Sequence, residues 1–586
     1  MIVPMKRLLL LCVAEDSANT LEKLRDLGAV HLELSQGGGG LTGTAKESLE
    51  RAERALRLVE KAKKDRKDPD ATSASLPVDE VLALDEKREA LKGELEALKA
   101  TCRRYEPFGD FDPALAKKLE AAGVKLVLRE DGTFEFLYGS EEGNGTARPL
   151  PLPAERLSVT QGKVAQAESE IDSLTAQIGA VESDALVKSV PGLQDAVAFA
   201  AAADEMAANR VSLGAAGEAT LATVSGWIAA DSEATLAAAA KANGWGLALR
   251  DPNADETPPT LIRPPKLFRP VKALFEGLGI APAYTEADVS VPFMCYFSVF
   301  FAMLVGDGAY GAIFLAATLW GWRKTSGRRS PVVKSWLLLM TVFSLATVAW
   351  GVLSNTWFGA SIPWCANWPT VKWLADPSYG NMMLLCFTIG VSHLMLARVW
   401  NGICRLNDTT CLAEFGWAGV LLFMYFVTNS IVGIFSGIPN AMYWVFGVSL
   451  VMVFGFSVKP SEFKTRGAEL GMLPLNIMSA LGDIISYVRL FAVGLASVKV
   501  AENFNSMATG LLDGADSLWV KAVMAVFMVA ILVLGHALNL VMAGLSILVH
   551  AVRLNTLEFS NHKGVSWAGY AFRPFRKYNQ QGNNNE

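Results

Sequence analysis

The pattern of apolar and polar residues changes abruptly near residue 270. Before it, short apolar runs alternate with Lys, Glu, Asp and Arg, whereas residues from about 290 to 558 form long apolar runs separated by short charged clusters. Asp307 is the only charged residue between Val291 and Trp322. Apolar runs of this length are typical of transmembrane helices. The pattern therefore predicts a soluble domain joined to a polytopic membrane domain.

Eight apolar segments predict an all-α membrane domain of eight helices over residues 291–558. A linker at 271–290 precedes this domain, and a polar tail at 559–586 follows it. The last two segments are longer than a bilayer core needs, which predicts two long, tilted C-terminal helices. The eight predicted spans are 291–305, 307–323, 332–357, 379–398, 412–436, 440–458, 470–501 and 518–556.

Basic residues between the spans predict the orientation of the membrane domain. They cluster after the second, fourth, sixth and eighth spans, and the other connections hold almost none. Cytoplasmic loops carry an excess of Lys and Arg. We therefore expect both termini and the large N-terminal domain to face the cytoplasm. The clusters include Arg323, Lys324, Arg328, Arg329, Lys334, Arg398, Arg405, Lys459, Lys464, Arg466, Lys563, Arg573, Arg576 and Lys577.

The soluble half, residues 1–270, reads as a mixed α/β cytoplasmic arm. "MKRLLLLCVAED" followed by "SANTLEKLRDLGAVHLEL" predicts strand, helix and strand, with the helix starting near Ser17. Apolar residues at 3–4 spacing predict an outgoing and a returning helix, and Asp131-Gly132 predicts a β-hairpin turn. The predicted parts are an α/β lobe at 1–42 plus 187–265, an antiparallel coiled-coil hairpin at 43–103 and 154–186, and a second α/β lobe at 104–153.

The sequence shows no pattern typical of a catalytic centre. The glycines of "SQGGGGLTGTAK" lack the Lys-Ser/Thr ending of a phosphate loop, and His31 is isolated, so we interpret it as a surface or lobe-packing residue. The seven cysteines form no CxxC pair, which favours packing roles. We therefore expect a non-catalytic protein with no cofactor, no metal site and no nucleic-acid partner.

Arg489 stands inside a segment, "LGDIISYVRLFAVGLASVKV", that otherwise reads as a membrane helix. A helical repeat of 100° per residue places it on a polar face of its span, and the last span has a similar face. The first face holds Ser479, Asp483, Ser486, Arg489 and Ser497, and the second holds Asn539, Ser546, His550 and Arg553. Three interpretations compete for Arg489: snorkelling to a headgroup, an ion pair with Asp483 or with another span, and a functional charge facing an aqueous cavity or a mobile partner.

Two motifs carry a resemblance to a known family. "SYVRLFAVGLA" (486–496) and "GLSILVHAVRLNTLEF" (544–559) resemble the paired signature of the large membrane stator subunit of rotary V/A-type ATPases, called subunit a or subunit I. "GWIAAD", "FFAMLVGDGAYG" and "WGVLSNTWFG" resemble further elements of this family in the expected order. The resemblance covers nearly the whole chain.

The resemblance implies a role for Arg489 beside a rotating ring of proteolipid subunits. In this family, two half-channels lead protons or sodium ions to a carboxylate on each ring subunit. The resemblance implies that Arg489 faces that carboxylate and separates the half-channels, that Arg553 assists, and that ion flow is coupled to ATP synthesis or hydrolysis on other subunits. It also implies that the arm docks peripheral stalks and a central-rotor adaptor. The expected location is a bacterial or archaeal-type cell membrane.

The chain departs from the family pattern at two positions. Eukaryotic relatives commonly have His and Glu where this chain has Ser497 and Ala543. The ion path is therefore assigned to local candidates, among which His550 ranks first because it shares the face of Arg553. Buried packing roles remain the alternative for His393 and Glu414. The candidates are Arg489, Arg553, His550, Asp483, Asp307, Ser497, Ser486, Asn539, Glu414 and His393. A secondary transporter and a pure membrane anchor stay open as alternative functions.

Overall fold

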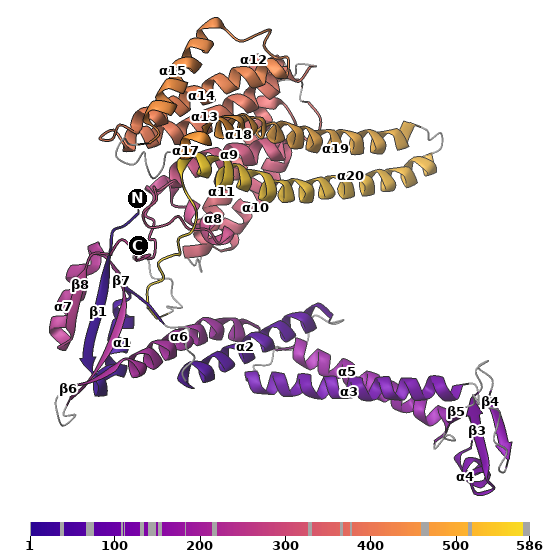
Figure 1. Cartoon of the computed structure of the whole chain (residues 1–586). Helices are drawn as coiled ribbons and strands as arrows, with labels where there is room; N and C mark the ends of the chain where they lie inside the picture. Colours follow the sequence, from indigo (N-terminus) through magenta and orange to yellow (C-terminus); the bar gives the residue numbers. More distant parts are fainter. Residues whose placement is uncertain are drawn as a thin grey trace.

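The computed structural model consists of an elongated arm, up to Arg250, and a helical bundle from Val271 onwards (Figure 1). The two parts meet near both chain termini. The structure describes residues 2–34, 40–65, 76–106, 109–110, 112–128, 134–138, 148–150, 155–181, 183–213, 219–325, 331–361, 363, 367–374, 378–458, 468–513 and 518–577.

An antiparallel sheet forms the base of the arm. Its strand order is β2-β7-β1-β8, and β6 also pairs with β7. From Leu8 onwards, β1 buries every second residue, Leu8, Leu10 and Cys12, against α1 and α6, because side chains alternate between the faces of a sheet. The predicted helix start at Ser17 is confirmed. The elements are β1 Met5–Val13, α1 Ser17–Leu27, β2 Val30–Leu32, β6 Arg210–Leu213, β7 Ala219–Ala229, α7 Glu233–Asn243 and β8 Gly246–Arg250.

Four long helices extend the arm away from the base. They are α2 Gly40–Asp65, α3 Val78–Tyr105, α5 Leu157–Gly179 and α6 Ser183–Ala208. α2 lies beside α6, and α3 lies beside α5 further out (Figure 1). Small residues allow a close approach, since a Cβ atom at Gly179 would lie 3.1 Å from the Ala62 carbonyl oxygen. α6 runs through the predicted lobe boundary at residue 187 and also packs against α1.

The far end of the arm carries a small α/β lobe. It consists of α4 Pro113–Ala121, β3 Val124–Leu128, β4 Phe134–Tyr138 and β5 Arg148–Leu150. β3 and β4 pair in antiparallel register, as the sequence predicted, with Val124 opposite Tyr138. The predicted turn at Asp131-Gly132 lies outside the described residues. The Asp112 side chain accepts a hydrogen bond from the Ala114 amide and so caps the start of α4.

The helical bundle is that of a multi-pass membrane protein. Among the described residues, five helical spans are long and apolar enough to cross a membrane, and a sixth counts if α9 and α10, bent by 119°, form one span. Helices occupy all eight predicted segments, but α15 is a shorter apolar helix, so the count of eight stays a prediction. The helices are α8 Val271–Leu278, α9 Ser290–Val305, α10 Gly308–Lys324, α11 Pro331–Ser354, α12 Pro369–Leu374, α13 Gly380–Cys404, α14 Cys411–Ile431, α15 Asn440–Phe456, α17 Ala468–Gly471, α18 Leu473–Ile485, α19 Val488–Asp513, α20 Leu518–Ser546 and α21 Ser560–Lys563.

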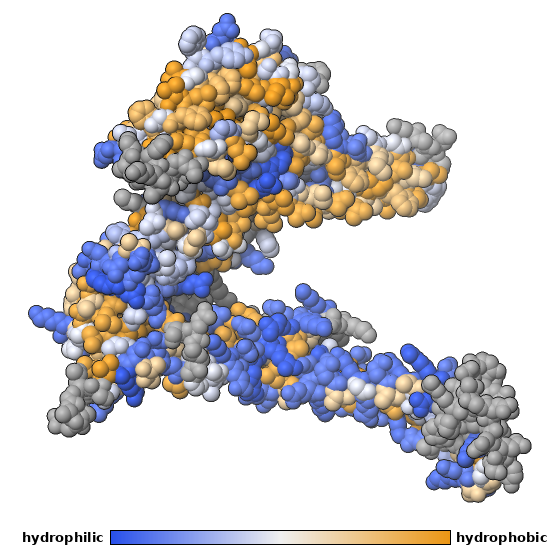
Figure 2. Space-filling model, viewed as in Figure 1, coloured by the Kyte–Doolittle hydropathy of each residue, from blue (hydrophilic) through white to orange (hydrophobic). Residues whose placement is uncertain are grey.

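The surface of the bundle is apolar, and that of the arm is polar (Figure 2). On α20, Trp519 is 83% exposed and Leu534 is 72% exposed. Large apolar side chains exposed along a helix mark a surface that faces lipid or another apolar protein surface. The interior of the bundle is rich in aromatic rings, among which Phe293, Phe300 and Tyr487 are fully buried.

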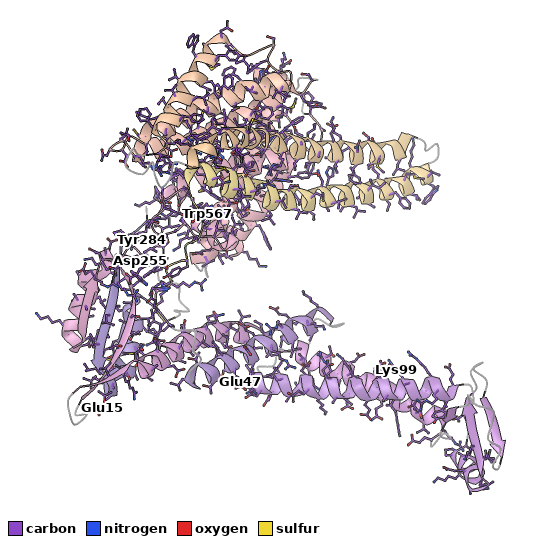
Figure 3. The ribbon with its side chains drawn as sticks, in the orientation of Figure 1. Glu15, Glu47, Lys99, Asp255, Tyr284 and Trp567 are labelled. Carbon is purple, nitrogen blue, oxygen red and sulfur yellow. The ribbon has the colours of Figure 1, made fainter. Side chains whose placement is uncertain are left out.

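The C-terminal strap, residues 565–577, joins the bundle to the base of the arm. Trp567 packs on Phe275 and Phe293 in the bundle, at ring-centroid distances of 5.5 and 5.9 Å (Figure 3). Phe575 is buried in the core of the base, and its amide donates to the Val30 carbonyl at 2.7 Å. The strap therefore packs the partly buried Trp567 ring against the bundle and the buried Phe575 ring into the base of the arm.

His31 on β2 is a lobe-packing residue, and its packing partners come from the strap. Its ring lies 5.8 Å from that of Tyr570 and 5.7 Å from that of Phe572. The Arg573 amide can donate to its Nδ1 atom at 2.9 Å, and the Arg573 carbonyl oxygen lies 3.0 Å from the same atom. Burial lowers the pKa of His31 below its usual value, which favours the neutral ring that can accept this bond.

Candidate functional site

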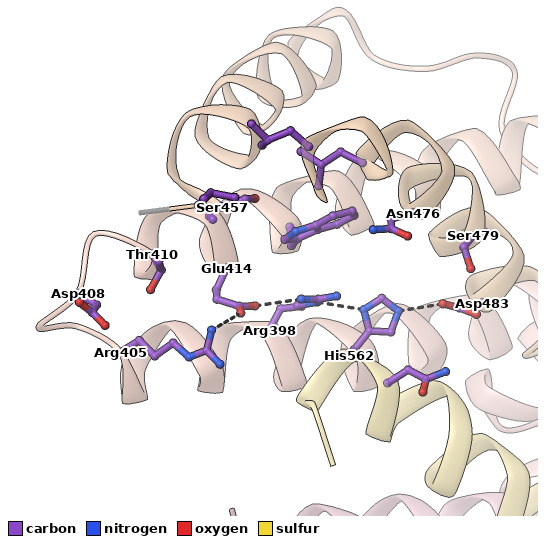
Figure 4. Close-up of a pocket in the computed structure, with 16 residues that line it drawn as sticks. Arg398, Arg405, Asp408, Thr410, Glu414, Ser457, Asn476, Ser479, Asp483 and His562 are labelled. Atoms are coloured by element: carbon purple, nitrogen blue, oxygen red, sulfur yellow. Dashed lines mark hydrogen bonds and ion pairs between the residues drawn. The ribbon is translucent and has the colours of Figure 1, made fainter. Parts of the chain in front are cut away.

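A chain of charged side chains crosses the end of the bundle that carries α21. We call Arg405, Glu414, Arg398, His562 and Asp483 the charged network; they come from α13, α14, α21 and α18 (Figure 4). Glu414 accepts from Arg398 at 3.1 Å and from Arg405 at 3.2 Å. His562 links Arg398 to Asp483, with nitrogen–nitrogen and nitrogen–oxygen distances of 3.1 and 3.0 Å.

The contacts of His562 define its tautomer. Its Nδ1 atom accepts from the Arg398 Nε–H group, because a guanidinium has no acceptor. The Nε2 atom therefore carries the ring proton in the neutral ring and donates it to the Asp483 carboxylate. A hydrogen-bonded route runs from Glu414 to Asp483 through Arg398 and His562.

The charged network lines a cavity of about 700 Å³. Figure 4 shows Glu414, Arg398, His562 and Asp483 in a row along it, with Asn476 and Ser479 above the Asp483 end of the row. A polar cavity of this size holds many waters. The Asp483 side chain lines this cavity and is 27% exposed.

The arginine cluster, which we define as Arg489, Glu558 and Arg553, lies beside this network. An Arg489 Nη2 atom donates to Glu558 Oε1 at 2.6 Å, and Arg553 Nε lies 3.5 Å from the same oxygen. The side chain of Glu558 is 6% exposed, that of Arg489 is 21% exposed and that of Arg553 is 57% exposed. Of the three interpretations from the sequence, the ion pair with another span describes the contact that the structure contains.

A change of helix type brings Arg553 and Glu558 together. Residues five apart in an α-helix point about 140° away from each other at 3.6 residues per turn. Residues Ile547–Ala551 and Leu554–Phe559 instead form π-helix, in which i→i+5 hydrogen bonds stack such residues on one face. The α-helical repeat used on the sequence could not align Glu558 with Arg553.

A break in the helix precedes Arg489. α18 ends at Ile485 and α19 begins at Val488, so a short turn interrupts the α-helix, although the two together form one apolar span of 39 residues, Leu473–Leu511. The Arg489 Nε atom donates to the Ser486 carbonyl at 2.9 Å, which fixes the guanidinium against the break. Tyr487 fills the space beside Gly390, where a Cβ atom would lie 2.6 Å from its ring, and its hydroxyl lies 2.9 Å from Nδ1 of the buried His393.

A second polar network follows α19 away from the arginine cluster. We call Ser497, Asn539, Tyr310, His536 and Asn505 the neutral network. Ser497 donates to Asn539 at 3.1 Å, and Asn539 donates to the Tyr310 hydroxyl at 3.0 Å. That hydroxyl lies 2.8 Å from His536 Nδ1, and His536 Nε2 lies 3.2 Å from Asn505 Oδ1. Ser497 and Asn505 lie about 12 and about 24 Å beyond Arg489 along the helix axis.

A second cavity, of about 440 Å³, adjoins this network. It is lined by Asn355, Thr356, Gly359, Ala360, Ser361, Val498 and Glu502. The two glycine-rich motifs of the sequence meet beside it, where a Cβ atom on Gly351 would lie 2.1 Å from Gly308 Cα. Both oxygens of the buried Asp307 accept backbone amides, from Ala309 and Gly359, each at 2.8 Å. Asp307 therefore caps α10 and holds this crossing together.

The structure separates the candidates into groups. Asp483 and Glu414 share the first cavity, and Ser497 and Asn539 belong to the neutral network. His550 is half-buried and interacts electrostatically with Arg489 and Arg553. The Ser546 and Ser486 hydroxyls donate to carbonyls of their own helices.

Sequence reasoning missed Glu558, Arg398, His562, Tyr310 and His536 as site residues. Glu558 and Tyr310 stand inside the quoted motifs, which is the signal that could have found them. Arg398 and His562 had no such signal, since each lies near the end of a span where charges are ordinary. Among the described residues, no group of three or more His, Cys, Asp and Glu could hold a metal ion.

Comparison with curated proteins finds relatives of one kind, although no family model matches the chain. "V-type ATP synthase subunit I" of Borreliella burgdorferi is 33% identical over 60% of this chain and 60% of its own length. "V-type ATP synthase subunit I 1" of Treponema pallidum is 27% identical over 98% of this chain and its whole length. "A-type ATP synthase subunit I" of Methanocaldococcus jannaschii is 25% identical over 55% of this chain and 49% of its length. The chain is therefore a homologue of proteins named V-type or A-type ATP synthase subunit I, the subunit a family, over up to 98% of its length.

Proposed function

We propose that this chain is the non-catalytic membrane stator subunit of a rotary V/A-type ATPase or ATP synthase. It conducts protons or sodium ions past a ring of proteolipid subunits, while other subunits synthesise or hydrolyse ATP. One observation carries the proposal: the arginine cluster lies between two polar networks, each next to its own cavity. Relatives named subunit I of ATP synthases support the same assignment.

In the proposed mechanism, Arg489 supplies a permanent charge to a carboxylate on the passing ring. Its Nε and Nη2 atoms are engaged by Ser486 and Glu558, and among the described residues its Nη1 atom makes no hydrogen bond. That atom is free to bind a carboxylate oxygen, and charge pairing favours the ionised carboxylate. Because a guanidinium does not lose its proton, it also repels a cation that would cross directly between the two cavities.

The two networks act as the two half-channels. Ions reach the ring carboxylate through the cavity of the charged network on one side and through the neutral network on the other. The basic clusters favour a cytoplasmic arm. α12 lies at the end of the bundle away from the arm (Figure 1), and this end is the outer side in the proposal. The charged network therefore opens towards the cytoplasm, and the neutral network opens towards the outside.

The arm acts as the static support of the motor. Its paired helices, proposed as an antiparallel coiled coil, hold the far lobe well away from the bundle, where it docks peripheral stalks and the central-rotor adaptor. The exposed apolar residues of α20 face lipid and the proteolipid ring. In this proposal the bundle crosses the membrane eight times, and both termini are cytoplasmic.

The direct test replaces Arg489 in the assembled complex. Arg489→Gln is expected to assemble normally and to abolish ATP-driven ion uptake into phosphatidylcholine–phosphatidylglycerol vesicles, together with coupled ATP hydrolysis. Lys521→Gln is the matched control, because Lys521 is an exposed cation on α20 outside all of the networks. Uptake at the normal rate by Arg489→Gln would overturn the assigned role and favour a membrane anchor. Transport of a solute without any ring would favour a secondary transporter.

A second test measures access from each side of the membrane. On a cysteine-free background, Ser479→Cys in the first cavity should react with a membrane-impermeant cationic thiol reagent from the cytoplasmic side. Ser361→Cys in the second cavity should react from the outside. Labelling of both positions from one side would contradict two separate half-channels.

A further inference from the structure

We propose that Glu558 is a fixed counter-ion that holds the net charge of the arginine cluster at one positive unit, matched to one ring carboxylate at a time. The inference rests on the proposed function and adds to it a positioning residue on the stator itself. The cluster contains two guanidiniums and one carboxylate, so two positive charges and one negative charge leave a single excess positive charge.

The buried Glu558 carboxylate lies between two permanent positive charges. Its side chain is 6% exposed, and both arginines contact its Oε1 atom, at 2.6 and 3.5 Å. Neither arginine can become neutral, so the carboxylate between them lowers their mutual repulsion most when it is ionised. Removing one partner of such a buried pair leaves an uncompensated charge, which is strongly unfavourable.

The local backbone places Glu558 at this position. The π-helical register aligns it with Arg553, and Ser560 reinforces the register by donating to the Asn555 carbonyl at 2.9 Å, five residues back. The Trp567 Nε1 atom in turn donates to the Ser560 hydroxyl at 2.8 Å. The C-terminal strap therefore supports the helix segment that carries the counter-ion.

The unequal exposure of the two arginines gives the cluster an inner and an outer pair. Arg489 is the better buried partner of Glu558, whereas the side chain of Arg553 is 57% exposed. The Glu558 Oε2 atom is buried, and among the described residues it has no hydrogen-bond partner. It offers Arg553 a second acceptor when a ring carboxylate binds Arg489. The ring carboxylate therefore meets one net positive charge both when it arrives and when it leaves.

A wrong charge count should slow the motor in either direction. With two excess charges, an arriving carboxylate is held too strongly and releases slowly. With none, it is not stabilised in its ionised form as it passes. Transport therefore depends on the difference between positive and negative charges in the cluster and not on either residue alone.

The test is a charge-balanced set of variants in the assembled complex, in phosphatidylcholine–phosphatidylglycerol vesicles. Proton uptake is followed with a pH-sensitive dye and sodium uptake with radioactive sodium. Glu558→Gln, which keeps shape and one acceptor, and Arg553→Gln should each lower ATP-driven uptake about tenfold or more. The double variant restores one excess charge and should transport faster than either single variant. Glu558→Asp keeps the charge and should stay within about threefold of the unaltered protein.

The pH profile provides a readout that a purely structural role would not move. An added positive charge beside the ring carboxylate lowers the pKa of that carboxylate, so the acidic limb of the Glu558→Gln profile should shift to lower pH. In the double variant, the acidic limb should return to the pH at which it lies in the unaltered protein. A double variant slower than both single variants, or an unshifted limb, would overturn the counter-ion role. If Glu558→Gln does not assemble, Arg553→Gln and the double variant still decide the question.

Arg489→Gln, measured in parallel, separates the two proposals. If it abolishes uptake while Glu558→Gln and Arg553→Gln each transport normally, the counter-ion inference fails and the proposed function stands. If Arg489→Gln itself transports normally, the proposed function fails.

Discussion

The two polar networks on either side of Arg489 differ in the kind of groups that compose them. The charged network contains two arginines, two carboxylates and a histidine around a cavity of about 700 Å³. The neutral network contains hydroxyl, amide, phenol and imidazole groups beside a cavity of about 440 Å³. One network thus consists of fixed charges, and the other consists of neutral groups that both donate and accept hydrogen bonds.

This difference has a physical basis in what each network must tolerate. Charged groups are expensive to bury, so they remain where a large cavity admits water. Neutral hydroxyl and imidazole groups can be buried when every donor finds an acceptor, as in the chain from Ser497 to Asn505. Removing one side chain should therefore lower stability and ion uptake more in the charged network than in the neutral network.

The largest effect is expected from Glu414→Gln, because the change leaves Arg398 and Arg405 without their shared carboxylate. We expect a stability loss of about 2–3 kcal/mol, below the full cost of breaking a buried pair because Arg405 is half exposed. Ion uptake should fall about tenfold or more. Thermal unfolding and vesicle uptake measure the two effects. Ser457→Ala, which removes a hydroxyl from the same cavity that bonds only within its own helix, is the control.

A smaller effect is expected from Tyr310→Phe, which removes the hydroxyl between Asn539 and His536. The free energy of unfolding should fall by about 1–2 kcal/mol, as expected for the loss of a buried neutral hydrogen bond. Uptake should slow by a few-fold while assembly stays intact. Tyr443→Phe is the matched control, since Tyr443 is 54% exposed on α15. A loss of stability as large as that of Glu414→Gln would contradict the expectation that the charged network is the more sensitive of the two.

A still smaller effect is expected from Ser497→Ala. Its hydroxyl donates to Asn539 at 3.1 Å, but Asn539 keeps its bonds to the Ser497 carbonyl and to Tyr310. The expected cost is about 0.5–1 kcal/mol, the ordinary worth of one neutral bond. Uptake should slow by less than it does in Tyr310→Phe. A larger loss of stability and uptake than in Tyr310→Phe would mean that the critical hydrogen-bond donor is Ser497 instead.

The smallest effect is a pH dependence at the C-terminal strap, which lies outside both networks. Burial lowers the pKa of His31, so the folded state favours the neutral ring. The strap's contribution is fully present above the usual histidine pKa of 6.5 and is lost as the pH falls through the lowered value. The hydrogen bond to the Arg573 backbone and the charge of Glu33 oppose this lowering of the pKa, and the charge of Arg573 adds to it. Protection from hydrogen exchange at residues 570–577, corrected for the intrinsic exchange rate at each pH, should therefore fall on acidification, and His31→Gln should remove that dependence.

The sequence predicted much of the fold because hydrophobic period and length are local properties. The strand and helix at the N-terminus, the β3–β4 pair and the apolar helices of the bundle lie where the pattern placed them. The break before Arg489 and the π-helix around Glu558 were not predictable in this way. Both are irregularities that tertiary packing imposes, through Tyr487 against Gly390 and through the strap at Ser560.

By itself, the sequence determined that a permanent charge stands in an apolar span and that two motifs resemble one family, since both depend only on residue type and spacing. Tertiary structure decided which groups meet. Glu558 reaches Arg489 from 69 residues away, and His562 joins Arg398 to Asp483 across three elements. Such contacts depend on how helices cross and change register, and no local pattern of residues encodes them.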